Sequence, residues 1–90
     1  MFLPDLLAGQ RFLITGGGGG LGSAMAERLG QLGASLLICG RRAEVLQATA
    51  DRLRAQGSVV EAAVCDVRDA AAVEAMVDAA WQQAPIDGLI

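Results

Sequence analysis

Apolar residues occur along this chain in two alternating patterns: short continuous runs, and longer stretches with an apolar position every three or four residues. The continuous runs lie at 11–15, 35–39 and 59–65, and a fourth begins at 86. Short apolar runs that stop at glycine or polar residues are typical of strands buried in a parallel sheet. We therefore expect four strands separated by three helices.

The first two intervening stretches have the spacing of amphipathic helices. One helix is expected from about residue 20 to 33 and the next from 43 to 56, each followed by a glycine stop. Their inward faces are formed by Leu21, Met25, Leu29 and Leu32 in the first helix and by Leu46, Ala50 and Leu53 in the second. These apolar faces would pack against the predicted sheet.

The third helix is expected to begin after Asp69, whose side chain is suited to cap it, and to end before Pro85. Its apolar residues recur at helical spacing and should face the core: Val73, Met76, Val77, Ala80 and Trp81. Trp81 is interpreted as a core residue rather than a stacking surface for a ligand.

Strands that alternate with helices of this length predict an α/β fold, a Rossmann-type doubly wound parallel sheet with right-handed crossovers. The expected strand order is 3-2-1-4. Ligands of such sheets bind beyond the carboxyl ends of the strands, here near strands 1 and 4.

Composition narrows the possible partners. The sequence has 90 residues and a net charge of −3, and its seven basic residues are all arginine without a basic stripe, so no nucleic acid partner is expected. No apolar run reaches the roughly 18–20 residues of a membrane span. The opening, MFLPDLLAGQ, lacks the positive region of an export signal. We expect a cytoplasmic protein with no membrane association.

Metal binding is not expected either. Cys39 and Cys65 are the only cysteines, and the chain has no histidine, so the two cysteines alone cannot supply a four-ligand zinc site. Both cysteines end predicted strands and are interpreted as buried, reduced thiols.

Five consecutive glycines stand between the first strand and the first helix. One interpretation is a flexible linker; the other is a loop whose backbone approaches a phosphate at the positive end of a helix. The run fits G-x-G-x-x-G and also T-G-x-x-x-G-x-G, and the strand before it and helix after it favour a dinucleotide site. A Walker-type loop is excluded, because the chain has no lysine. The residues expected at the pyrophosphate are Gly16, Gly18, Gly19, Gly20, Leu21 and Gly22.

The end of the second strand bears on the choice of dinucleotide. An NAD site usually has an acidic residue there, whereas this chain has Gly40 followed by Arg41 and Arg42. Two guanidinium groups could hold a 2′-phosphate, which predicts NADP(H) rather than NAD. The alternative is that both arginines form a solvated start to the next helix.

The stretch ITGGGGGLGSAMAERLGQLGASLLICGRR, together with CDV and IDGLI, resembles the short-chain dehydrogenase/reductase family over nearly all 90 residues. The resemblance implies that Gly16, Gly20 and Gly22 are the family's motif glycines and that the Leu21 N–H lies near the phosphates. Gly19 stands where the family often has a side chain. Asp66 would accept a hydrogen bond from the adenine amino group, and Val67 would pack near the ring. Alternatively, Asp66 is a turn or capping residue.

By this resemblance the protein is an NADP(H)-dependent oxidoreductase that transfers a hydride to or from a carbonyl/alcohol or an enoyl thioester. The likeness to dienoyl-CoA reductases implies a small-molecule substrate such as an acyl-CoA, and relatives are commonly homo-oligomers, tetramers or dimers. The family's catalytic Tyr and Lys are absent from this sequence, so no catalytic residue is predicted.

Residues 1–90 are therefore expected to be the amino-terminal, cofactor-binding part of a single NAD(P)-binding domain, interrupted in its fourth strand at Ile90. The alternatives are a non-catalytic dinucleotide-binding module or an inactive truncated product. A methyltransferase-like fold that binds S-adenosylmethionine would prefer an acidic residue in place of Gly40.

Overall fold

The computed structural model describes residues 6–16 and 20–89, which form alternating strands and helices. In chain order these are β1 (Arg11–Thr15), α1 (Gly20–Gln31), β2 (Ser35–Gly40), α2 (Ala43–Ala55), β3 (Val59–Val64), α3 (Ala70–Gln83) and β4 (Gly88–Leu89). The predicted α/β class is confirmed, and each expected strand and helix lies within about two residues of its predicted position.

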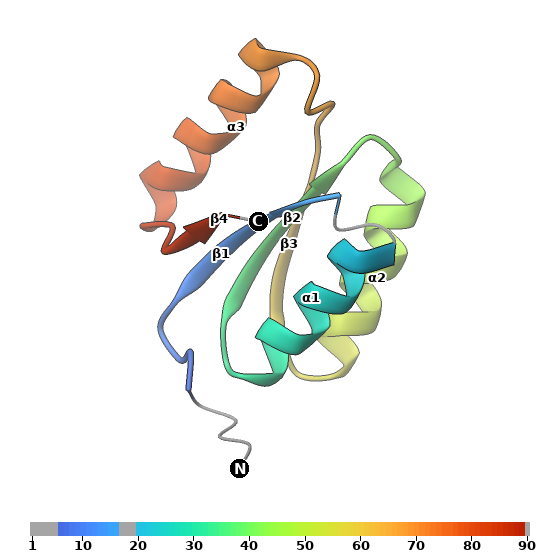
Figure 1. The fold of residues 1–90 in the computed structure, drawn as a ribbon, viewed down its shortest axis with the longest axis vertical. Helices are drawn as coiled ribbons and strands as arrows, with labels where there is room; N and C mark the ends of the chain where they lie inside the picture. Colours follow the sequence, from blue (N-terminus) through green and yellow to red (C-terminus); the bar gives the residue numbers. More distant parts are fainter. Residues whose placement is uncertain (1–5, 17–19, 90) are drawn as a thin grey trace.

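All strand pairs in the sheet are parallel, and the strands lie in the order β3-β2-β1-β4. Leu36 pairs with Phe12 on one side and with Val60 on the other, and Phe12 pairs in turn with Gly88. Because the strands run in one direction, the carboxyl ends of β1, β2 and β3 lie at the same edge of the sheet (Figure 1).

Helices cover both faces of the sheet, with α1 and α2 on one side and α3 on the other (Figure 1). Alternate residues of each strand therefore enter different cores: Ile14 packs with the residues of α1 and α2, whereas Leu13 packs with those of α3. The larger core contains Ile14, Ala26, Ala34, Leu36, Ile38, Leu46, Ala50, Leu53 and Val60. The prediction for the inward face of α2 is thus confirmed.

The amino end of α3 is capped as predicted, because an Asp69 carboxylate oxygen accepts a hydrogen bond from the Ala72 N–H at 3.2 Å. The inward face of this helix differs from the prediction at one position. Ala80 is buried, but Trp81 is 51% exposed, so its assignment to the core was wrong. Trp81 lies one turn after Val77 on the same side of α3, where that side borders an open groove.

Trp81 lines an open groove of about 290 Å³ beside β4. Leu13, Val77 and Ile86 form the apolar part of this groove. The spacing of apolar residues gave the correct helix, but it could not show that the described sheet leaves this rim uncovered.

Arg11 ties β1 to the end of α3, a role that the sequence did not reveal. Its side chain is only 12% exposed, and Nη1 donates hydrogen bonds to the carbonyl oxygens of Ala80 at 2.6 Å and Ala84 at 2.9 Å. The Arg11 backbone N–H also donates to the Asp87 carboxylate at 2.8 Å. These bonds satisfy carbonyl groups that the end of a helix leaves free.

Within residues 6–16 and 20–89, no helix combines the length and apolar character needed to cross a bilayer.

Candidate functional site

The carboxyl ends of three neighbouring strands bring the predicted site residues to one edge of the sheet. Thr15 is the last residue of β1, and Gly40 is the last residue of β2. The Cys65 N–H donates to the Gly40 carbonyl at 2.8 Å, which extends the pairing of β2 and β3 by one residue beyond β3. Asp66, the next residue, therefore lies close to the end of β2. Arg41 begins the connection that follows β2.

The first and last residues of the glycine run have backbone conformations that favour glycine. Gly16 has φ = +67° and Gly20 has φ = +52°, in the left-handed region that other residues rarely adopt. A Cβ added at either position would meet no atom within 4 Å, so backbone conformation, and not crowding, selects glycine there. Gly18 and Gly19, which are also predicted site residues, lie outside the described residues.

The first turn of α1 faces this edge and can bind an anion. The helix begins at Gly20, and Leu21 and Gly22 follow within the first turn, where backbone N–H groups have no partner inside the helix. No acidic residue stands in this turn, so nothing on the helix itself neutralises its positive end. The open space at Gly16 and Gly20 leaves the backbone accessible to a ligand.

Two buried cysteines lie beneath the same edge. Cys39 and Cys65 are free thiols in the core under α3, which confirms that they are buried and reduced. Burial and the neighbouring Cys65 raise the pKa of the Cys39 thiol, and a hydrogen bond from the Gly16 backbone opposes that rise. Cys39 is therefore a neutral group that supports the start of the glycine loop.

Arg41 and Arg42 project from the connection between β2 and α2, and both are exposed. Arg42 occupies the residue before the first turn of α2, in an extended conformation with φ = −98° and ψ = 104°, and its side chain makes no capping bond to that helix. The position fits both predicted roles, a solvated helix start and a binding site for a phosphate.

Asp66 closes the turn between β3 and α3, as the alternative interpretation of this residue predicted. Its Oδ1 accepts hydrogen bonds from the Arg68 backbone N–H at 2.9 Å and from Arg68 Nε at 3.1 Å. Its Oδ2 accepts from Arg68 Nη2 at 3.1 Å. The side-chain and backbone bonds from Arg68, with a smaller effect of the Arg41 charge, lower the pKa of Asp66 to about 2.

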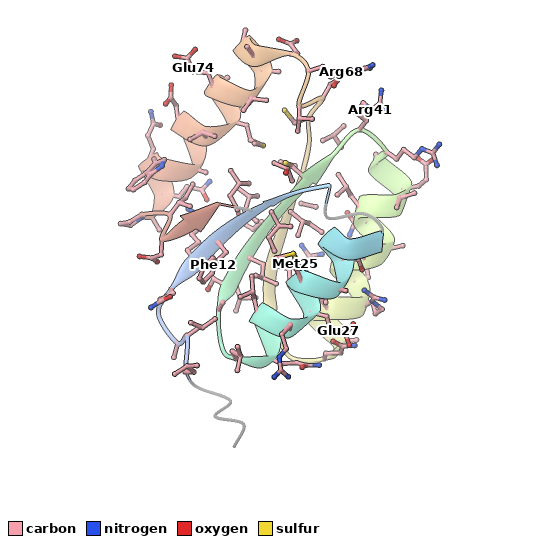
Figure 2. The ribbon with its side chains drawn as sticks, in the orientation of Figure 1. Phe12, Met25, Glu27, Arg41, Arg68 and Glu74 are labelled. Atoms are coloured by element: carbon pink, nitrogen blue, oxygen red, sulfur yellow. The ribbon has the colours of Figure 1, made fainter. Side chains whose placement is uncertain are left out.

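Arg68 was not singled out from the sequence, although it stands two residues after an aspartate, a spacing at which local side-chain to backbone bonds form. Figure 2 shows Arg41 and Arg68 at the same end of the molecule. Val67, which stands between Asp66 and Arg68 in the chain, is 54% exposed. The described part of the chain holds no cluster of three potential metal ligands.

A parallel sheet with helices on both faces and a glycine-rich turn after its first strand is the Rossmann-type architecture, a class of folds that binds nucleotides at the carboxyl ends of its strands. The family model described as "short chain dehydrogenase" matches residues 10–90. The chain belongs to that family, whose members similar to this chain include several oxidoreductases.

Two curated relatives illustrate the similarity. An uncharacterized oxidoreductase of Caenorhabditis elegans is 47% identical over 77 residues, which are 84% of this chain and 25% of the relative. A peroxisomal 2,4-dienoyl-CoA reductase of Arabidopsis thaliana is 40% identical over 81 residues, 90% of this chain and 27% of the relative. The chain thus spans about a quarter of the length of these relatives.

Solved structures of similar proteins match the fold closely. A citronellol catabolism dehydrogenase of Pseudomonas aeruginosa PAO1 superimposes with a TM-score of 0.94 and 37% identity, over 99% of this chain and 38% of that one. A metagenomic short-chain oxidoreductase in complex with NADP gives 0.89 and 32%, over 92% and 38%. A short-chain dehydrogenase/reductase of Burkholderia phymatum in complex with NAD gives 0.80 and 38%, over 91% and 28%.

Proposed function

We propose that this chain provides the NADP(H) site of a short-chain oxidoreductase. The observation that carries the proposal is the position of two structural features at one edge of the sheet. These are a glycine turn that opens α1, and paired guanidinium groups that follow β2. NADP carries two separate phosphate groups, the pyrophosphate and the 2′-phosphate. The glycine turn would bind the first, and the arginine pair would bind the second.

The glycine turn would hold the pyrophosphate. The positive φ values of Gly16 and Gly20 bend the chain so that the first turn of α1 faces the edge, and the absence of side chains leaves the backbone open. The pyrophosphate would accept hydrogen bonds from the backbone of Gly18, Gly19, Gly20, Leu21 and Gly22. The helix dipole of α1 adds a favourable interaction with the negative charge.

Arg41 and Arg42 would select the phosphorylated cofactor. Gly40 provides no carboxylate that would bind a ribose 2′-OH or repel a 2′-phosphate, and both arginines are exposed at the strand end. Solved relatives include an NADP complex and an NAD complex, so the family architecture by itself leaves the choice open. The arginine pair therefore carries the preference for NADP(H) in this chain.

Asp66 and Val67 would surround the adenine. The Asp66 side chain is 37% exposed and remains ionised, so it offers an acceptor to the adenine amino group. Val67 presents an exposed apolar side chain next to it, which suits a contact with a flat ring. Both residues follow β3 and thus stand one strand away from the arginine pair.

The bound nicotinamide would supply the hydride in a reduction or accept it in an oxidation, and the residues of this chain would bind and orient the cofactor. The sequence has no tyrosine and no lysine, so we assign no proton-transfer role to residues 1–90. The whole protein would reduce or oxidise a carbonyl/alcohol or an enoyl thioester. The 2,4-dienoyl-CoA reductase among its relatives supports an acyl-CoA substrate. We extend the proposal to a cytoplasmic homo-oligomer.

Binding of NADPH and NADH to the purified protein, measured by calorimetry, tests this function. Replacing both Arg41 and Arg42 with Ala should weaken NADPH binding by roughly 10-fold or more, because charge-assisted hydrogen bonds are lost, and should change NADH binding by less than about 3-fold. The control change Arg28→Ala removes a positive charge at the last turn of α1, away from the candidate site, and should leave both affinities nearly unchanged. Equal losses for NADPH and NADH would contradict the assignment.

A further inference from the structure

We propose that Arg68 is a positioning residue for adenine recognition: it holds the Asp66 carboxylate so that Oδ2 keeps one acceptor position open toward the ligand. This inference rests on the proposed function, since it concerns the same NADP(H) site. In this role Arg68 would act on the cofactor through Asp66.

Arg68 binds Asp66 through three donors at once. Its backbone N–H and Nε both donate to Oδ1, at 2.9 and 3.1 Å, and Nη2 donates to Oδ2 at 3.1 Å. Two parallel bonds from one guanidinium edge fix the plane of a carboxylate as well as its position. The Asp69 N–H donates to the Asp66 carbonyl at 2.9 Å and so fixes the backbone of the same turn.

The remaining acceptor capacity lies on Oδ2. A carboxylate has about four acceptor positions, two on each oxygen. Arg68 occupies both positions of Oδ1 and one position of Oδ2. Among residues 6–16 and 20–89 no further donor to this carboxylate is found, and the Asp66 side chain is 37% exposed, so we infer that the fourth position accepts from the ligand. The adenine amino group can direct one N–H at Oδ2, and this single donor matches the remaining acceptor position.

The alternative partner for Arg68 is the 2′-phosphate, because Arg68 lies at the same end of the molecule as Arg41 (Figure 2). Binding a phosphate through the two-donor edge of Nε and Nη2 would break both bonds to Asp66. Within the described part of the chain, the Asp66 carboxylate would then keep one donor, the backbone N–H of Arg68. The edge formed by Nε and Nη2 is therefore committed to Asp66, and the nucleotide comparison below decides whether Arg68 also binds the phosphate.

Titration tests whether the Arg68 guanidinium acts on the Asp66 carboxylate, and the comparison of nucleotides below tests whether that action serves the ligand. With Arg68 present, the pKa of Asp66 is lowered to about 2, so the carboxylate protonates only as the pH falls through that value. Without the guanidinium, the pKa should rise toward the usual aspartate value of about 3.9. A carbon NMR titration of the Asp66 carboxyl in the protein and in its Arg68→Met variant measures this change directly.

The decisive test compares NADPH with its hypoxanthine analogue, in which an oxygen replaces the adenine amino group. The protein should bind NADPH about 10-fold more tightly than the analogue, and Arg68→Met should reduce that ratio to near one. Arg68→Lys, which cannot bind both carboxylate oxygens in the same plane, should give an intermediate ratio. Arg28→Met serves as the control and should leave the ratio unchanged.

Several results would overturn the inference. Arg68→Met could weaken both nucleotides equally, or the unaltered protein could fail to distinguish them. A selective loss of NADPH relative to NADH, with the adenine ratio intact, would make Arg68 a phosphate ligand instead. If Arg68→Met proves unfolded by circular dichroism, the ratio for Arg68→Lys decides, and an unchanged ratio there refutes the inference. Failure of the unaltered protein to bind any of these nucleotides would refute the proposed function as well.

Discussion

At the scale of single residues, Gly16 shows how backbone geometry selects an amino acid. Its φ of +67° lies in the left-handed region, yet a Cβ there would meet no atom within 4 Å. Gly40 presents the opposite case, because it has no positive φ and its added Cβ would make an ordinary contact, 3.5 Å from Leu46. A side chain at Gly16 would therefore strain the backbone, whereas alanine at Gly40 would fit without strain.

Gly16→Ala should lower the free energy of unfolding by about 1 kcal/mol, because the left-handed conformation is strained for alanine and only part of this strain is offset by the stiffer unfolded chain. The matched change Gly40→Ala should alter stability by less than about 0.5 kcal/mol or raise it slightly. Urea unfolding followed by circular dichroism measures both. A neutral Gly16→Ala variant would mean that the loop relaxes without cost.

The sequence predicted which residues lie at the candidate site, but it did not predict all the hydrogen bonds that these residues make. The positions of Arg41, Arg42 and Asp66 followed from where the strands end, because parallel strands bring their carboxyl ends together. The partner of Asp66 was not predicted, since the bonds from Arg68 depend on a turn conformation that apolar spacing does not encode. For the same reason the sequence left open whether Asp66 was a turn residue.

At the scale of elements, the end of α3 depends on one side chain from β1. Arg11 is nearly buried, and its guanidinium bonds the carbonyl groups of Ala80 and Ala84. It also lies 3.7 Å from the Glu61 carboxylate on β3. Arg11 therefore links a strand, a helix end and the edge of the sheet at the side opposite the candidate site.

Arg11→Met should reduce the free energy of unfolding by about 1–3 kcal/mol, because it retains the apolar stem but leaves two partly buried carbonyl groups without a charged donor. Arg52→Met is the matched control: that side chain is 50% exposed and pairs with Glu27 at the surface, so its loss should cost less than about 1 kcal/mol. Urea unfolding midpoints compare the two variants. Equal midpoints would show that Arg11 contributes no more than a surface ion pair.

Periodicity predicted the helices well but not every inward residue. Leu46, Ala50 and Leu53 are buried as expected, since each lies at the centre of the apolar face of α2. Trp81 lies at the rim of α3, where a spacing pattern does not distinguish a covered side chain from an exposed one. Burial at a rim depends on which element lies alongside, and this is a property of the whole fold.

At the scale of the whole molecule, the alternation of apolar runs and helical stretches was sufficient to predict the α/β class. The pattern of period two within β1 explains why the sheet has two cores, with Ile14 facing α1 and α2 and Leu13 facing α3. The glycine turn, the arginine pair and the Asp66 turn then lie at one edge because of strand direction, although Asp66 stands 50 positions after Gly16 in the chain.

A crystal structure of the protein grown with NADPH tests the central claim most directly. The account predicts the diphosphate against the first turn of α1, the 2′-phosphate within hydrogen-bond distance of Arg41 or Arg42, and the adenine amino group at Asp66 Oδ2. Nucleotide density at any other surface, with the β1–α1 turn empty, would contradict the claim.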